Sequence, residues 1–108
     1  MPKYLFEGHY TVEGAKALAK EGGSSRRAAM SKAVESLGGK LESFHFAFGG
    51  VDVYLVADLP DNVSAAAASL AVSQGGAASS KTVVLLTPEE MDNAAKKTVV
   101  YHPPGHKA

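Results

Sequence analysis

The sequence predicts an α+β fold, with a four-stranded antiparallel sheet that carries its helices on one face. Apolar and polar side chains alternate over residues 3–10 and 40–48, as they do in half-buried strands, and residues 81–87 form a β-branched run. Residues 24–37 carry apolar side chains at helical spacing. Glycine pairs separate these segments, which is typical of turns. The resulting order is that of a ferredoxin-like βαββαβ unit with a short C-terminal helix added.

The first half of the chain is predicted to form a strand, helices and a second strand. In residues 3–10, Leu5, Glu7 and His9 share one side and the aromatic residues share the other. Residues 11–20 form a short helical segment, and after the Gly22-Gly23 break Ser24 or Ser25 can cap the next helix. Residues 40–48 form the second strand, with Ser43 and His45 on one side. Three aromatic residues share its other side: Phe44, Phe46 and Phe48.

The second half begins with a hairpin at Gly49-Gly50, because tight turns between strands need positive φ angles. A third strand at 52–58 and an alanine-rich helix at 63–73 follow, and small side chains let this helix lie close to the phenylalanines of the second strand. Residues 81–87 form the fourth strand, and Thr87-Pro88 begins a helix that extends to about Lys96. We expect a brief extra strand at 98–101, one domain over 1–101 and a flexible tail over 102–108.

Composition excludes several classes of function. The 108 residues include 11 basic and 11 acidic ones, so we expect neither a nucleic-acid nor a membrane partner. Without cysteine there is no disulfide, thiolate metal site or thiol catalysis, and with no signal-peptide pattern we expect a cytoplasmic protein. His102 and His106 have the spacing of a metal-binding pair, but two prolines between them prevent a helix, so no metal site is expected. No motif indicates a cofactor, and none is expected.

One face of the predicted sheet lacks a cover. Both main helices are expected on the side of the phenylalanines, which leaves the face with Leu5, Glu7, His9, Leu41 and His45 open. We therefore expect the chain to form a homo-oligomer, a dimer or larger, through that face.

Three stretches of the chain resemble the GYD-domain family. They span nearly its full length: KYLFEGHYTVEG, KEGGSSRRAAMSKAVESLGGKLESFHFAFGGVDVYLVADLPDN and KTVVLLTPEEMDNAAKK. The family is named after a Gly-Tyr-Asp triplet, which stands here as Gly50-Val51-Asp52, so no role of that tyrosine carries over. The resemblance implies a dimeric α/β barrel in which two ferredoxin-like sheets face each other. It names no reaction, because that group of folds includes small monooxygenases, isomerases, haem enzymes and binding modules.

The first candidate site is the mixed polar face that carries Glu7, His9, Ser43 and His45. A carboxylate near imidazoles can transfer protons, because histidine titrates near neutral pH. The alternative is that these groups form hydrogen bonds at an interface or lie at strand ends in water.

The second candidate pairs Asp52 with Tyr54 on one side of the third strand, where an acid and a phenol can contact one ligand. The alternative is an ordinary turn role for Asp52, which follows two glycines.

The third candidate is an anion site at Ser25, Arg26 and Arg27. Arginine in the first turn of a helix opposes the helix dipole, and a bound anion would remove that conflict. The alternative is a capping serine followed by solvated arginines that pair with Glu21 or Glu35.

Two functions remain open on this evidence. The first is an oligomeric module that binds a small molecule or another protein. The second is a cofactor-independent enzyme, similar to a monooxygenase or an isomerase, in which His9 or His45 is the base and Tyr54 the donor for a small organic substrate. Convergence of His9, His45, Asp52 and Tyr54 on one pocket would favour the enzyme.

Overall fold

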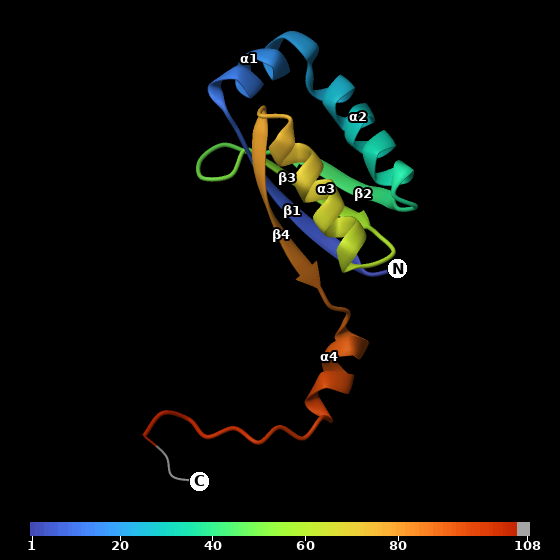
Figure 1. Cartoon of the computed structure of the whole chain (residues 1–108), viewed down its shortest axis with the longest axis vertical. Helices are drawn as coiled ribbons and strands as arrows, with labels where there is room; N and C mark the ends of the chain where they lie inside the picture. Colours follow the sequence, from blue (N-terminus) through green and yellow to red (C-terminus); the bar gives the residue numbers. More distant parts are fainter. Residues whose placement is uncertain (106–108) are drawn as a thin grey trace.

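The computed structural model describes residues 1–105, and His106 with the end of the predicted tail lies outside them. Four strands form one antiparallel sheet in the order β2-β3-β1-β4 (Figure 1), which is compatible with the ferredoxin-like arrangement and confirms the predicted α+β fold. The strands are β1 (Lys3–Tyr10), β2 (Lys40–Phe46), β3 (Val53–Asp58) and β4 (Ala78–Leu85). The helices are α1 (Val12–Glu21), α2 (Gly23–Ser36), α3 (Asn62–Gln74) and α4 (Pro88–Ala95).

Short polar side chains begin three helices in the way the sequence suggests. Thr11 caps α1, Asp61 caps α3, and Thr87 forms a capping box with Glu90 at the start of α4. The backbone N–H of Ser64 donates to the Asp61 carboxylate, and this hydrogen bond lowers the pKa of Asp61.

The start of α2 differs from the prediction. Gly22 has a φ of 94°, a conformation that favours glycine, and it joins α1 directly to α2. The helix begins at Gly23, so Ser24 and Ser25 lie in its first turn and neither caps it. The predicted serine cap is therefore wrong, because a single glycine makes the whole turn between the helices.

Two strand boundaries also differ. β2 ends at Phe46, although Ala47 still donates across the hairpin to the carbonyl oxygen of Asp52. Phe48 lies in the loop and is fully exposed. β4 begins at Ala78 rather than at residue 81, because its backbone pairs with β1 from Tyr10 onward. The extra strand predicted at 98–101 is wrong, since these residues have no regular secondary structure.

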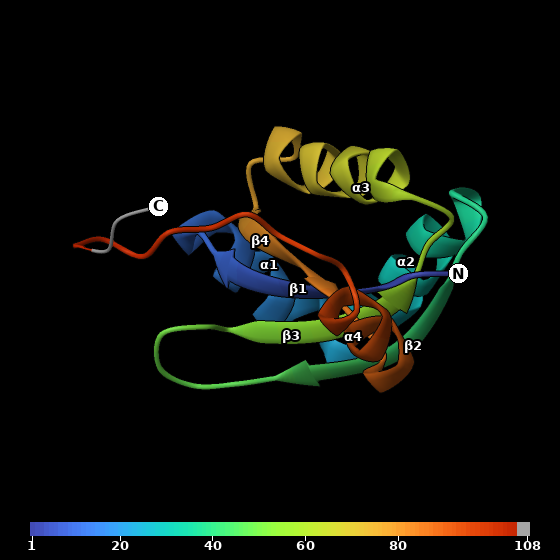
Figure 2. The ribbon, with the colours of Figure 1, turned by 90° about the horizontal axis from the view of Figure 1, so that it is seen from below.

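The core lies between the sheet and one layer of helices. Its buried side chains come mainly from the two central strands: Tyr4, Phe6, Val34, Val53, Leu55, Ala57, Leu59 and Ala65. Figure 2 shows α3 standing over one face of the sheet. No element of residues 1–105 packs over the opposite face at its centre, where Leu5 and Val56 are only half-buried.

The two main helices stand over opposite edges of the sheet. α2 packs on β2, and α3 packs on β4. The expectation that the alanine-rich helix covers the phenylalanines is therefore wrong. Phe44 packs against the core beside α2, and a Cβ on Gly23 would approach the Phe46 ring to 2.9 Å.

The C-terminal segment projects from the domain (Figures 1 and 2). Every residue from Leu86 to Gly105 is exposed, including those of α4. The radius of gyration is 17.4 Å, against about 13 Å for a compact chain of this length. We call residues 86–105 the C-terminal arm.

Candidate functional site

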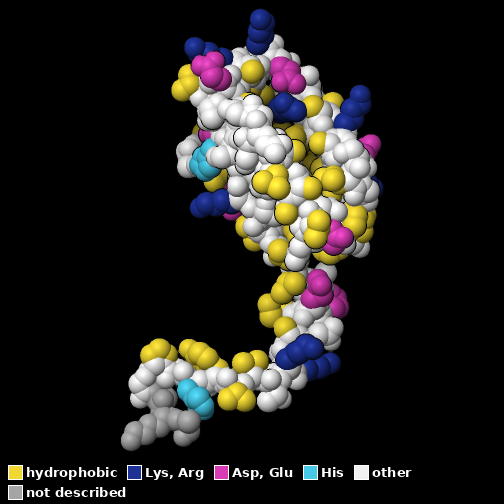
Figure 3. All heavy atoms as spheres, viewed as in Figure 1, with side chains coloured by type: hydrophobic (Ala, Val, Ile, Leu, Met, Phe, Trp, Pro, Cys, Tyr) yellow, Lys and Arg dark blue, Asp and Glu magenta, His cyan; other side chains and the backbone are white. Residues whose placement is uncertain are grey.

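A cleft of about 420 Å³ lies between α2, α3 and the sheet, and we call it the helix cleft. It exists because the two helices stand over opposite edges of the sheet, which leaves a gap between the helices above the central strands. The floor comes from Phe6, Gly8, Val53 and Leu55 on β1 and β3. Figure 3 shows hydrophobic side chains in the hollow between the helices. Its volume is within the range of about 300–1,000 Å³ that is typical of small-molecule sites.

Small residues give the helix cleft its depth. The wall from α3 is made by Ala67, Ala68, Ala71 and Val72, so this helix presents no large side chain to the space. Gly8 lies in the floor, where a Cβ would approach Cγ1 of Val53 to 2.6 Å. A larger residue at these positions would occupy the volume that a ligand needs.

The polar end of the helix cleft is formed by Arg26 and Tyr10. The Arg26 side chain is 33% exposed, and its Nη1 lies 3.9 Å from Oε2 of Glu21. Its Nε is buried and has no hydrogen-bond partner among the described residues. Burial raises the pKa of the half-buried Tyr10 phenol, the carboxylates of Glu21 and Asp52 raise it further, and Arg26 opposes the effect.

The predicted polar face lies on the other side of the sheet, and we call it the open face. The prediction that Leu41 belongs to it is wrong, because a register shift between Leu41 and Ser43 places Leu41 opposite Ala57 and against the core. In one row across the strands, Glu7 of β1 is opposite Lys81 of β4 and Tyr54 of β3, and Tyr54 is opposite His45 of β2. His9 lies farther along β1, opposite Ser79, so it does not share that row. The row combines a carboxylate, an ammonium group, a phenol and an imidazole, and these four side chains are exposed or half-exposed.

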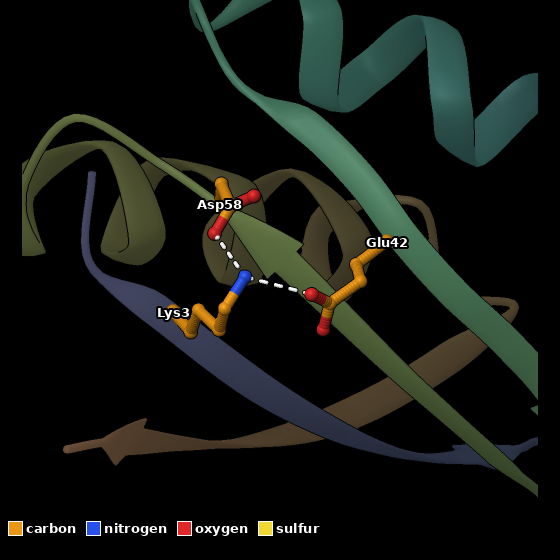
Figure 4. Close-up of polar contacts among 3 residues, drawn as sticks. All are labelled: Lys3, Glu42 and Asp58. Carbon is orange, nitrogen blue, oxygen red and sulfur yellow. Dashed lines mark hydrogen bonds and ion pairs between the residues drawn. The ribbon is translucent and has the colours of Figure 1, made fainter. Parts of the chain in front are cut away.

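Beside this row, the centre of the open face is apolar. Leu5 and Val56 are half-buried, and Val83 is 39% exposed. The face ends at Lys3, whose Nζ donates to Oε1 of Glu42 at 2.7 Å and to Oδ1 of Asp58 at 2.9 Å (Figure 4). These hydrogen bonds raise the pKa of Lys3. The network joins β1, β3 and β2 at one end of the sheet.

Asp52 and Tyr54, its predicted partner, have different surroundings. Its Oδ2 accepts a hydrogen bond of 2.9 Å from the backbone N–H of Tyr10, and its own N–H donates to the carbonyl oxygen of Gly8. These bonds attach the hairpin to β1, as the turn interpretation expected of this residue. The Asp52 side chain reaches a second, shallower depression beside α1, together with Phe46 and Phe48.

The three residues of the predicted anion site have different surroundings. The Ser25 hydroxyl donates to Glu21 at 3.3 Å, and Arg27 is exposed. Only Arg26 reaches the helix cleft. In residues 1–105, no group of three His, Cys, Asp or Glu residues is arranged to hold a metal ion.

The family model of the GYD domain matches residues 4–95. The chain belongs to the GYD family. No curated protein and no solved structure matches this GYD protein. Among its described residues, no helix is long and apolar enough to cross a membrane.

The helix cleft of this GYD protein was not predicted from its sequence. The available signal was the run of small residues in α3 together with Gly8, since both lie opposite large core residues in a βαββαβ unit. These small residues form a cleft only because α2 and α3 stand over opposite edges of the sheet, and that arrangement depends on tertiary packing. The sites proposed from the open face stay predictions.

Proposed function

We propose that this GYD protein is a homo-oligomeric module that binds a small organic molecule in the helix cleft. The observation that carries the proposal is a mostly apolar cleft of about 420 Å³ with one polar end. The module works in the cytoplasm under this proposal, since a domain without cysteine needs no oxidising compartment. The bound molecule lies between α2 and α3, and it needs no cofactor.

The same proposal assigns the open face to a second copy of the chain. The face is apolar at its centre, and its polar row contains both charge signs, so two copies related by a twofold axis can pair Lys81 with Glu7. The C-terminal arm supports this pairing. Met91, Val99, Val100 and Tyr101 are all more than half exposed and need a surface outside their own domain.

An enzymatic role has less support. His9 and His45 are exposed, Tyr54 is 39% exposed, and none of the three lines the helix cleft or the depression beside α1. Asp52 is occupied by the backbone of Tyr10. The four residues therefore do not share one pocket, which is the arrangement that a monooxygenase-like or isomerase-like mechanism would need.

Filling the helix cleft tests the binding proposal. Ala71→Phe places an aromatic ring in the cleft, whereas Ala66→Phe adds the same ring to another exposed position of α3 that does not line it. Octanol is a neutral apolar probe, and calorimetry measures its binding. We expect the wild-type protein and Ala66→Phe to bind octanol and Ala71→Phe to lose at least about tenfold in affinity. Equal affinity in all three proteins would refute the cleft as the binding site.

Light scattering tests the pairing proposal. Val83→Glu adds a charge to the centre of the open face, and Val63→Glu adds one to an exposed position of α3. We expect the wild-type protein and Val63→Glu to be dimers or larger, and Val83→Glu to dissociate, because a buried unpaired charge is unfavourable. A wild-type mass of 11.2 kDa at micromolar concentration would refute the pairing.

A further inference from the structure

The helix cleft has opposite character at its two ends. Along α2 its lining extends from Arg26 to Leu37, a length of about 16 Å at the helical rise per residue. The stretch beyond Arg26 is lined by Met30, Val34 and Leu37 on this helix and by alanines on α3. The cleft therefore has a long apolar body and one charged end, where Arg26 lines the cleft and the Glu21 carboxylate lies 3.9 Å from its guanidinium.

Arg26 has unused hydrogen-bonding capacity at that end. Its Nε is buried and has no hydrogen-bond partner within the described chain. The pairing with Glu21 is loose, because 3.9 Å is longer than a hydrogen bond. Glu21 is also engaged by the Ser25 hydroxyl. An acceptor that enters the cleft can reach the guanidinium more closely than Glu21 does.

Tyr10 lines this end as well as the depression beside α1, and its phenol is a second donor. Its pKa is raised, mainly by burial, so the phenol keeps its proton at neutral pH. Arg26 lies near enough to oppose that rise. A guanidinium and a neutral phenol together favour an anionic acceptor with more than one oxygen, and a carboxylate meets this requirement.

We propose that the ligand of the helix cleft is an amphiphilic carboxylic acid, with its carboxylate on Arg26 and its hydrocarbon body between α2 and α3. This inference rests on the proposed function of the cleft and adds the chemical class of its ligand. Chain length is limited by the distance from Arg26 to Leu37, so medium-length acids fit best. Phosphates and other compact anions lack the apolar part that most of the lining requires.

The test compares octanoate with octanol, which differ in charge and share a similar hydrocarbon body. Calorimetry is carried out with the wild-type protein, Arg26→Gln, Arg26→Lys and Arg27→Gln, where Arg27 is the neighbouring arginine outside the cleft. Because hydrogen bonds to charged groups contribute strongly, we expect Arg26→Gln to weaken octanoate binding about tenfold or more. Arg27→Gln should leave it unchanged, and Arg26→Lys should restore part of it. Octanol binding should change less than about twofold in all of these variants.

The outcomes separate this inference from the proposed function. If octanol and octanoate bind equally and Arg26→Gln changes neither, the cleft binds apolar molecules and the carboxylate proposal is wrong. If Ala71→Phe leaves the binding of both probes unchanged, or if neither probe binds, the proposed function fails with it. Unfolding midpoints of the Arg26 variants within a few degrees of the wild-type value would show that lost binding is not lost folding.

Discussion

The hydrogen bond between Tyr4 and Asn62 provides a sharp test of the packing. Tyr4 is 1% exposed, and its hydroxyl donates to Oδ1 of Asn62 at 2.7 Å, which attaches β1 to the first turn of α3. Tyr4→Phe keeps the ring and removes only the hydroxyl. The exposed Asn62 oxygen can then bind water, so we expect a loss of about 1 kcal/mol in the free energy of unfolding.

Asn62→Ala removes the other partner and has a different consequence. The Tyr4 hydroxyl then stays at a buried residue without an acceptor, which costs about 1–3 kcal/mol. The substitution also gains some unfolding free energy, because alanine has a higher helix propensity than asparagine. In the Asn62→Ala background, Tyr4→Phe should therefore be neutral or stabilising.

Urea denaturation of the wild-type protein, both single variants and the double variant measures this coupling. At about 1 kcal/mol, the expected shift in melting temperature for Tyr4→Phe is about 4–8 °C. Ser73→Ala on α3 is the control: it also removes one hydroxyl, from an exposed position outside the helix cleft and the open face, and should change the stability by less than about 0.5 kcal/mol. The reasoning is refuted if Tyr4→Phe has the same effect with and without Asn62.

Three further predictions concern the loops, the ion network and the C-terminal arm. Gly14→Ala should lower the unfolding free energy by about 1–3 kcal/mol in denaturation experiments, because its Cβ would overlap the Ala77 carbonyl, whereas Gly75→Ala, which meets only ordinary contacts, should not. Because the pKa of Lys3 is raised in the folded protein, its ion pairs stabilise the fold fully below pH 10.5, its ordinary pKa, and this stabilisation is lost as the pH rises through the folded-state pKa. Lys3→Met should therefore lose less unfolding free energy than the wild-type protein above pH 10.5. An identical loss in both proteins would contradict this. Thr87→Ala removes the N-cap of α4 and should increase the rate of amide hydrogen exchange in this helix. The global unfolding midpoint should stay unchanged, since α4 is exposed. A lower midpoint would show that α4 contributes to the stability of the fold.

The local signals of the sequence predicted much of the fold. Alternation placed Glu7 and His45 on the open face and Phe6 on the helix side, because strand periodicity leaves only two faces. The same alternation extended β2 to Phe48, since a pattern does not show where hairpin bonds close. The start of β4 was missed because Ser79 and Ser80 lack strand propensity and are held by pairing with β1.

The candidate site was less predictable than the fold. The sequence predicted a role for Arg26 in an anion site at the start of a helix. In the structure Arg26 lies at one end of the helix cleft. That context depends on the separation of α2 from α3, which no local pattern contains. The proximity of Glu7, Tyr54 and His45 likewise depends on β3 lying between β1 and β2.

The strand order has a consequence for how the chain folds during synthesis. β1 is the first strand made, yet its partners are β3 and β4, the last two. The hairpin of β2 and β3 can form early from neighbouring residues, and β1 can pair with β3 once the chain has been made to Asp58. The other edge of β1 stays unpaired until the chain has been made to Leu85. Pairing over such sequence separations is slow, so we expect the closure of β4 on β1 to limit the folding rate and to be the stage most vulnerable to aggregation.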